Sequence, residues 1–220
     1  MSAQAPTRRP AAAPVRRGPS KAARARRRKA LRRRLLLLTG LALAALVLWV
    51  RPFADKAVHE ISLPLRHEDI IRQQAADKSL DPSLIAGVIY VESRFRDQTS
   101  RAGAKGLMQI LPSTADYIAR KSGGTRFTQG DLATPQINIA YGSWYLRYLL
   151  QHYHGNELLA IAAYNAGEGK VDEWYRDAVM RGEDFEATTH IPFPETRDYV
   201  GRVLSARSQY RSSYAHELGI

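Results

Sequence analysis

The amino-acid sequence predicts an all-α domain over residues 65–220, preceded by one transmembrane helix. Three observations support this class. Apolar residues recur at helical spacing beyond residue 64, the expected helices begin at Pro, Asp or Asn start signals and are joined by short Gly/Pro connections, and no alternating strand or internal repeat stands out. A chain of 220 residues is long enough for one such domain with a sizeable core.

Each expected helix has a recognisable start or stop in the sequence. Side-chain caps and a proline in the first turn mark the starts, because they satisfy or avoid the unpaired N–H groups there. In chain order, the first three predicted helices lie at residues 67–80, from the pair Asp81-Pro82 through Glu92, and at 112–121. The next begins at the pair Thr134-Pro135 and has an apolar face of Ile137, Tyr141, Trp144, Tyr145 and Tyr148. The last two run from Asn156 to a stop at Gly167 and from Pro194 through residues 195–210.

The net charge of +12 belongs to one end of the chain. Residues 1–34 hold thirteen Lys/Arg and no Asp/Glu, which leaves twenty basic against twenty-one acidic residues in 35–220. The domain therefore has no overall positive field for nucleic acid. The basic segment alone could contact RNA or DNA, but its position before the apolar stretch is better explained by membrane topology and attraction to anionic lipids, so no nucleic-acid partner is expected. The chain has no cysteine, which excludes disulfides, thiolate chemistry and Cys-based metal sites.

An uncharged apolar stretch follows this basic segment. Residues 1–34 are expected to be a disordered cytoplasmic tail, and residues 35–50 to form a transmembrane helix about 24 Å long. The arginines before it would stay in the cytoplasm, which places residues 51–64, a linker, and the domain outside. Two other interpretations remain: a signal peptide cleaved near Ala42-Leu43-Ala44, and a buried core helix.

A carboxylate on an apolar helix face is the first sign of a functional site. Counting back from Glu92, the residues Ile85, Val88 and Ile89 share its face of the expected helix. A carboxyl group among such neighbours loses hydration, which raises its pKa toward the range of a general acid. The alternative is an ion pair with Arg94 or with another nearby arginine, Arg96, that merely ends the helix.

Two glycine-containing stretches later in the chain also suggest a ligand site. Gly103 and Gly106 permit a tight loop. This loop could present Met108 as an apolar contact and Gln109 as an amide to a ligand. In the second stretch, Tyr164 and Asn165 stand at a helix end beside two more glycines. Taken singly, each stretch is equally well explained as a turn or as core packing.

Four motifs together are similar to a known family. Their order and spacing resemble those of the lytic transglycosylase domain of the soluble-lytic-transglycosylase type, which is related to goose-type lysozyme. The resemblance covers roughly residues 63–210, and the stretch at 119–132 is not a family signature. The matching motifs are Glu92-Ser93, Gly106-Leu107-Met108-Gln109, Ala163-Tyr164-Asn165-Ala166-Gly167 and "IPFPETRDYV" at 191–200.

The resemblance implies a lysozyme-like fold with a groove that binds peptidoglycan glycan strands. It also implies that Glu92 is the single catalytic acid/base and that a serine binds the acetamido group of the substrate. The substrate-binding positions that it assigns are Ser100, with Thr99 as the alternative, Met108, Gln109, Tyr164, Asn165 and Glu195.

The implied reaction is cleavage of the β-1,4 bond between N-acetylmuramic acid and N-acetylglucosamine with formation of 1,6-anhydromuramyl ends. Most glycosidases use two carboxylates, whereas only Glu92 stands in a motif that looks catalytic. Two alternatives stay open. One is a hydrolytic lysozyme that uses Asp97 or another groove carboxylate, and the other is a non-catalytic glycan-binding module of the cell wall.

No cofactor or metal is expected. His152-x-His154 has metal-like spacing, but no third ligand follows at a sensible distance, and a polar helix end before Gly155 explains the pair better. The aromatic residues from Tyr141 to Tyr148 recur at helical spacing, so most of them are assigned to packing. Membrane tethering would keep such an enzyme near its insoluble substrate.

Overall fold

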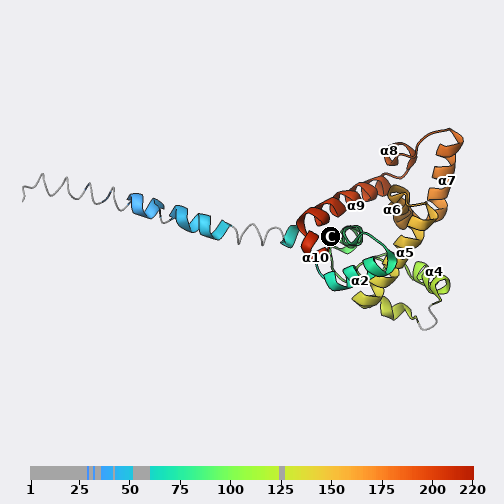
Figure 1. Ribbon diagram of the computed structural model, residues 1–220, viewed down its shortest axis with the longest axis horizontal. Helices are drawn as coiled ribbons and strands as arrows, with labels where there is room; N and C mark the ends of the chain where they lie inside the picture. The colour runs from blue at the N-terminus through green and yellow to red at the C-terminus, as the bar shows by residue number, and fades with distance from the viewer. Residues whose placement is uncertain (1–28, 30–31, 33–35, 42, 52–59, 124–126) are drawn as a thin grey trace, which may run out of the picture. The chain divides into compact units, whose positions relative to one another are not determined.

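The structure is a computed structural model that describes residues 29, 32, 36–41, 43–51, 60–123 and 127–220 (Figure 1). Its contacts divide the chain into two units, Met1–Lys56 and Ala57–Ile220. Most of the predicted basic tail lies outside the described residues.

In the N-terminal unit, residues 36–41 and 43–51 are helical and their side chains are exposed. No helix within the described ranges is both long enough and apolar enough to cross a membrane. The predicted segment at 35–50 falls partly outside those ranges, since residues 35 and 42 are not described.

The unit Ala57–Ile220 is all-α, as predicted. Its described residues form no named β-strand, and two isolated bridges join Thr99 to Lys105 and Lys105 to Ile110. In chain order the helices are α2 (Glu68–Lys78), α3 (Pro82–Ser93), α4 (Pro112–Ser122), the 3-10 helix η1 (Gln129–Ala133), α5 (Pro135–His152), α6 (Glu157–Ala166), α7 (Glu168–Met180), α8 (Ala187–His190), α9 (Pro194–Ser213) and α10 (Ala215–Leu218).

The predicted starts and stops are largely confirmed. The Asp81 carboxylate accepts the backbone N–H of Ser83 at 2.9 Å, and the Asn156 side chain accepts that of Leu159 at 3.2 Å. Helix α2 ends two residues before the predicted boundary at residue 80, because Ser79 takes a left-handed conformation with φ 52°. A terminal residue in this conformation commonly closes a helix.

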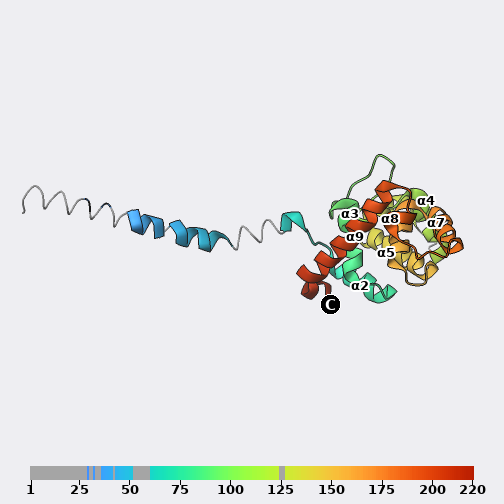
Figure 2. The same ribbon diagram turned by 90° about the horizontal axis from the view of Figure 1, so that it is seen from above.

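Helices α3 and α9 form the main packing contact of the domain, and they lie side by side in Figure 2. Gly87 makes this approach possible, since a Cβ there would stand only 3.0 Å from the backbone nitrogen of Arg207 and 3.2 Å from the carbonyl of Val203. The helices run antiparallel, because Asp81 at the start of α3 pairs with Arg207 at 2.9 Å, near the end of α9. The end of α3 therefore faces the beginning of α9.

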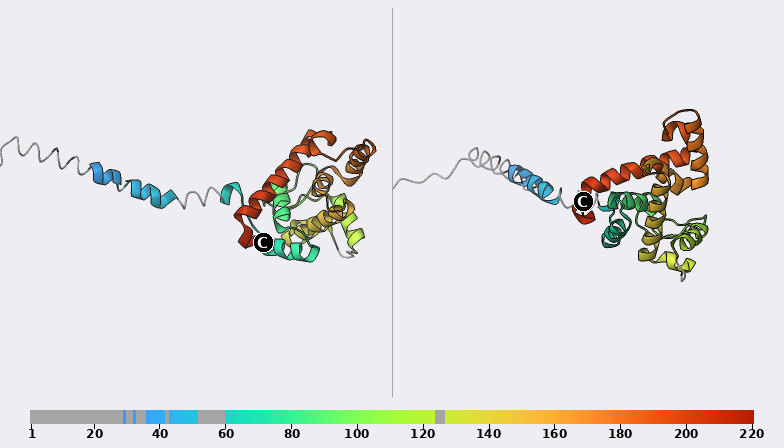
Figure 3. Two further views of the ribbon diagram at one scale, coloured as in Figure 1. Left: turned by 45° about the horizontal axis from the view of Figure 1, so that its top comes forward. Right: turned by 45° about the vertical axis from the view of Figure 1, so that its right-hand side comes forward.

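Helix α7 was not predicted as a separate helix. It follows α6 after one residue, Gly167, whose φ of 88° suits glycine and lets the chain change direction at once. Figure 3 shows α7 and α8 gathered near the beginning of α9, away from the C-terminus. This turn brings the end of α6 and the first turns of α7 and α9 to one end of the domain.

Candidate active site

Glu92 lies in the last turn of α3, where this helix packs against α9. Arg94 ends the helix in a left-handed conformation with φ 52°, so Glu92 and Ser93 are its final residues. The Tyr199 hydroxyl, on the first turns of α9, donates a hydrogen bond of 2.6 Å to Oε1 of Glu92.

Burial raises the pKa of Glu92 to about 7, and it outweighs the hydrogen bond from Tyr199 and the charge of Arg202, which both lower the pKa. Burial disfavours the ionised carboxyl because the charge loses its hydration. Neither predicted alternative partner forms an ion pair with Glu92: Arg94 and Arg96 are both exposed. A carboxyl with a pKa near 7 can donate a proton and take it back at neutral pH.

Ser93 connects the end of α3 to the loop that follows it. Its buried hydroxyl lies 2.7 Å from the carbonyl of Leu107 and 3.1 Å from that of Ile89, one turn back in the helix. The 2.7 Å bond fixes the loop at the residue next to Glu92. The Glu-Ser pair thus supplies the buried carboxyl group with one residue and positions the loop with the other.

A buried amide supports the same loop from the opposite side. Asn138 of α5 accepts the N–H of Met108 at 2.8 Å and donates to the carbonyls of Lys105 at 2.9 Å and Leu132 at 3.0 Å. Gly106 is required beside it, since a Cβ there would stand 2.1 Å from the Asn138 amide nitrogen. Gln109 takes a left-handed φ of 47° and donates its amide to the Gly106 carbonyl at 2.7 Å.

The predicted ligand contact of Met108 is wrong for its side chain. Met108 is fully buried, and its side chain packs against Gly142 of α5, where a Cβ would stand 2.3 Å from the sulfur. Its backbone carbonyl instead accepts the hydroxyl of Tyr164 at 3.0 Å. Met108 therefore belongs to the core beneath the site.

The end of α6 supplies the opposite wall. Tyr164 spans from α6 to the loop, and burial raises the pKa of its hydroxyl well above the usual value, so it stays protonated. Asn165 is exposed, and its side-chain oxygen accepts the Thr196 hydroxyl of α9 at 2.8 Å. This bond joins the end of α6 to the first turn of α9.

These elements enclose a cavity of about 450 Å³. Of the predicted site residues, Glu92, Ser100, Gln109, Tyr164, Asn165 and Glu195 line it, and Met108 does not. Thr99 and Asp97 line a different cavity. Lining residues that the sequence reasoning did not assign to the site are Ala102, Ala104, Ile110, Leu111, Thr114, Tyr145, Ala166 and Gly167.

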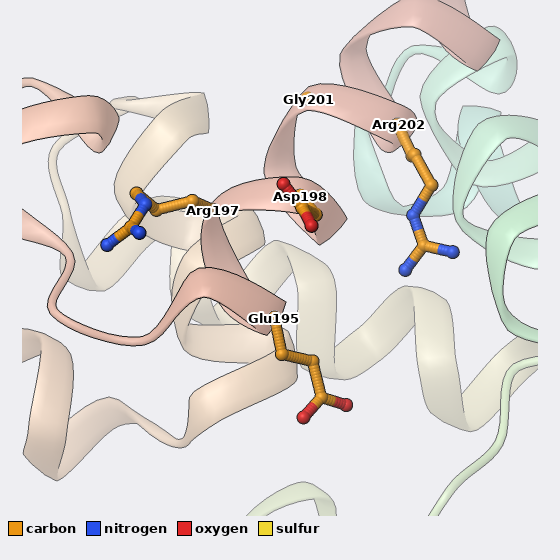
Figure 4. Close-up of a pocket in the computed structure, with 5 residues that line it drawn as sticks. All are labelled: Glu195, Arg197, Asp198, Gly201 and Arg202. Carbon is orange, nitrogen blue, oxygen red and sulfur yellow. The ribbon is translucent and has the colours of Figure 1, made fainter.

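A second depression, of about 660 Å³, lies along α9 and shares Glu195 with this cavity. Figure 4 shows the Glu195 carboxylate and the Arg202 guanidinium on this helix, with Arg197 extending away from both. Arg197 is held there by a hydrogen bond of 2.6 Å to the carbonyl of Ile191. The groove is therefore continuous with a charged surface on α9.

The histidine pair does not assemble a metal site. His152 bonds to Asp172 at 2.9 Å, and the carboxylate also accepts the Tyr153 hydroxyl at 3.0 Å. Among the residues with described positions, no group of three or more His, Asp or Glu stands close enough to hold a metal ion.

The helical domain and a groove that holds Glu92, whose pKa is raised by burial, are the features expected of a lysozyme-like protein. The transglycosylase SLT domain model matches residues 69–184, and the chain belongs to this family. The family expected from the four motifs is thus confirmed.

Relatives of known name support the assignment. The chain is 34% identical over 154 residues to the soluble lytic murein transglycosylase of Escherichia coli K12, covering 69% of this chain and 24% of that protein. It is 33% identical over 162 residues to the membrane-bound lytic murein transglycosylase C of Actinobacillus pleuropneumoniae, covering 64% of this chain and 44% of that one. The chain spans about a quarter of the length of the E. coli relative.

Solved structures agree with the fold. An inactive mutant of the lytic transglycosylase Slt from Pseudomonas aeruginosa superposes with a TM-score of 0.64 at 34% identity, over 71% of this chain and 26% of that one. The 70-kDa soluble lytic transglycosylase of E. coli gives the same TM-score and identity over 70% of this chain and 25% of that chain. A complex of a 70-kDa soluble lytic transglycosylase with bulgecin A matches equally well.

Proposed function

We propose that this protein is a peptidoglycan lytic transglycosylase that uses Glu92 as its single acid/base. The observation that carries the proposal is the burial of Glu92 in the groove with a pKa of about 7, in a chain of the SLT family. The names of the relatives, each a lytic murein transglycosylase, support the substrate class.

The first step of the proposed reaction is proton transfer. Protonated Glu92 donates to the glycosidic oxygen between N-acetylmuramic acid and N-acetylglucosamine, and the C1–O bond breaks. The oxygen of the muramyl acetamido group stabilises the cationic C1. Ser100 and Gln109 line the groove beside Glu92, and in the proposal they bind this acetamido group and position the sugar.

The second step closes a ring without water. Glu92, now a carboxylate, takes the proton of the muramyl C6 hydroxyl, whose oxygen bonds to C1 and forms the 1,6-anhydro sugar. The Tyr199 hydrogen bond stabilises the carboxylate between the two steps. Glu92 ends protonated, ready for another cycle.

The test is mass spectrometry of the fragments that the full chain releases from purified peptidoglycan, with Glu92→Gln in parallel. Products one water lighter than the reducing sugar, absent with the variant, are expected. Release of the same products by Glu92→Gln would refute the assignment of the acid.

A hydrolytic reaction is the second candidate, and one observation favours it: Glu195 provides a second carboxylate in the groove. Asp97, the residue first considered for this role, is exposed and lines another cavity. Reducing ends in place of anhydro ends, lost in Glu195→Gln, would establish hydrolysis with Glu195 as the base.

The proposal includes a single membrane anchor at residues 35–50, with the N-terminus in the cytoplasm and the domain outside. Support comes from the uncharged apolar run, the arginines that precede it and the helical conformation of residues 36–41 and 43–51. The membrane-bound relative is consistent with it. Because the chain has no cysteine, single cysteines at Ser2 and Ser212 allow a labelling test in intact cells. An impermeant thiol reagent should label only the second.

A further inference from the structure

A smaller cavity opens from the groove on the side of α7. Its volume is about 290 Å³, and it shares Asn165, Ala166 and Glu195 with the groove. Its other wall is formed by Lys170 on the first turn of α7 and by Phe193 just before α9. The two cavities therefore adjoin at the end of α6 and the start of α9.

The outer wall of this smaller cavity contains the ammonium group of Lys170 and the aromatic ring of Phe193. The Lys170 ammonium lies 4.9 Å from the centre of the Phe193 ring, and Trp174 packs edge-on against that ring with 5.4 Å between centroids. Phe193 is 44% exposed although it borders the cavity. Trp174 thus fixes a ring whose other parts are free to contact a ligand.

Within the described part of the chain, Lys170 forms no ion pair or hydrogen bond, although Glu195 lines the same cavity. The cavity therefore presents Glu195 on the wall it shares with the groove and an ammonium group on the far wall. A ligand that suits both walls offers hydroxyl or amide hydrogens toward Glu195 and a negative charge toward Lys170.

We propose that Lys170 and the Phe193 ring form a binding site for a carboxylate that the glycan strand carries on its muramyl residues. This inference rests on the proposed function, since it names a further part of the same substrate. Two sources share this chemistry: the free lactyl carboxylate of a strand without peptides, and the carboxylates of an attached stem peptide. The apolar atoms next to the carboxylate would lie on the ring, and the ammonium would pair with the charge.

The experiment measures binding and cleavage separately. Binding of the full chain in detergent is followed by co-sedimentation with insoluble peptidoglycan, in the Glu92→Gln background so that no cleavage occurs. Two substrates are compared, intact peptidoglycan and strands stripped of peptides by an amidase and immobilised on beads so that they also sediment, each also with its carboxylates converted to amides. The variants are Lys170→Met, Lys170→Arg and Lys121→Met; Lys121 stacks over Tyr117 on α4, 5.7 Å from the ring centre and outside the groove, and is the matched control.

Lys170→Met should weaken binding about threefold to tenfold on a substrate with carboxylates, as expected for a partly exposed charge pair, whereas Lys170→Arg and Lys121→Met should bind like the parent. Loss confined to stripped strands identifies the lactyl carboxylate, and loss confined to intact peptidoglycan identifies the peptide. Unchanged binding of Lys170→Met to both substrates, or an equal loss on the amide forms, would overturn the proposal. Cleavage of the same intact peptidoglycan is measured with Glu92 restored. If Lys170 is needed for binding but this chain releases no fragments, the proposed function is refuted and this site stands.

Discussion

The hydroxyl of Tyr199 lies 2.6 Å from Oε1 of Glu92, and it joins two helices whose contacting residues are 107 positions apart in the sequence. The bond favours the ionised carboxyl, whereas burial favours the neutral one and is the stronger effect. Glu92 is thus protonated in a sufficient fraction of molecules to donate a proton, and the carboxylate that remains accepts the hydrogen bond of Tyr199.

Tyr199→Phe should extend activity to higher pH. The hydrogen bond lowers the pKa of Glu92, so its loss raises that pKa and keeps the acid protonated further into the alkaline range. We expect the alkaline limb of the pH profile, near 7 in the parent, to move up by about one pH unit. The buried Tyr210, also on α9, provides the control: Tyr210→Phe should leave the limb in place. A limb that moves down would contradict the assigned role of Tyr199.

The raised pKa of Glu92 also predicts how stability depends on pH. An unfolded glutamate has a pKa of 4.5, and the folded one about 7, so between these values the folded chain holds a proton that the unfolded chain has lost. Stability from this group is therefore complete below pH 4.5 and decreases as pH rises toward 7, by on the order of 3 kcal/mol. Glu92→Gln removes this dependence. Its melting temperature relative to the parent should rise between pH 5 and pH 8, and a constant difference would disprove the shift.

Ser93→Ala should loosen the loop beside the acid. The change leaves the Leu107 carbonyl, in a residue only 2% exposed, without its 2.7 Å partner. We expect a loss of about 1–3 kcal/mol in the free energy of unfolding, together with reduced cleavage. Ser205→Ala, an exposed serine of α9, serves as the matched control and should change neither. Urea unfolding and the rate of muropeptide release test both quantities.

Gly87→Ala should separate α3 from α9. The added methyl group meets backbone atoms of Arg207 and Val203 at 3.0 and 3.2 Å, and backbone yields less easily than a side chain. Overpacking of this kind costs about 1–3 kcal/mol. In Gly201→Ala, also within a helix, the methyl group meets nothing within 4 Å, so this control should be as stable as the parent or slightly more so. Equal melting temperatures for both variants would show that the close approach of α3 and α9 at Gly87 does not limit the stability of the domain.

Much of the fold follows from local signals in the sequence. Asp81 and Asn156 cap their helices as predicted, because a cap needs only residues two or three positions away. Helix α7 was missed although Val171, Trp174 and Ala178 recur at helical spacing, because Gly167 was interpreted as a stop without a new start.

The site was predicted where a motif places a side chain directly in the groove, as for Gln109 and Asn165. It was incomplete where residues act through contacts between distant segments. Asn138 of α5 bonds to the loop and Tyr199 of α9 bonds to Glu92, and no pattern near either residue in the sequence indicates its partner. Met108 was misassigned because its burial depends on the absence of a side chain at Gly142, on a helix more than thirty positions away.

The position of α9 in the chain has a consequence for synthesis. Glu92 emerges from the ribosome about a hundred residues before Tyr199, and until α9 packs against α3 its carboxyl group is hydrated and ionised like any glutamate in water. A nascent or half-folded chain therefore carries no acid able to cleave glycan at neutral pH. On the proposed function, the chain becomes able to cleave glycan only when the last long helix has been made and packed against α3.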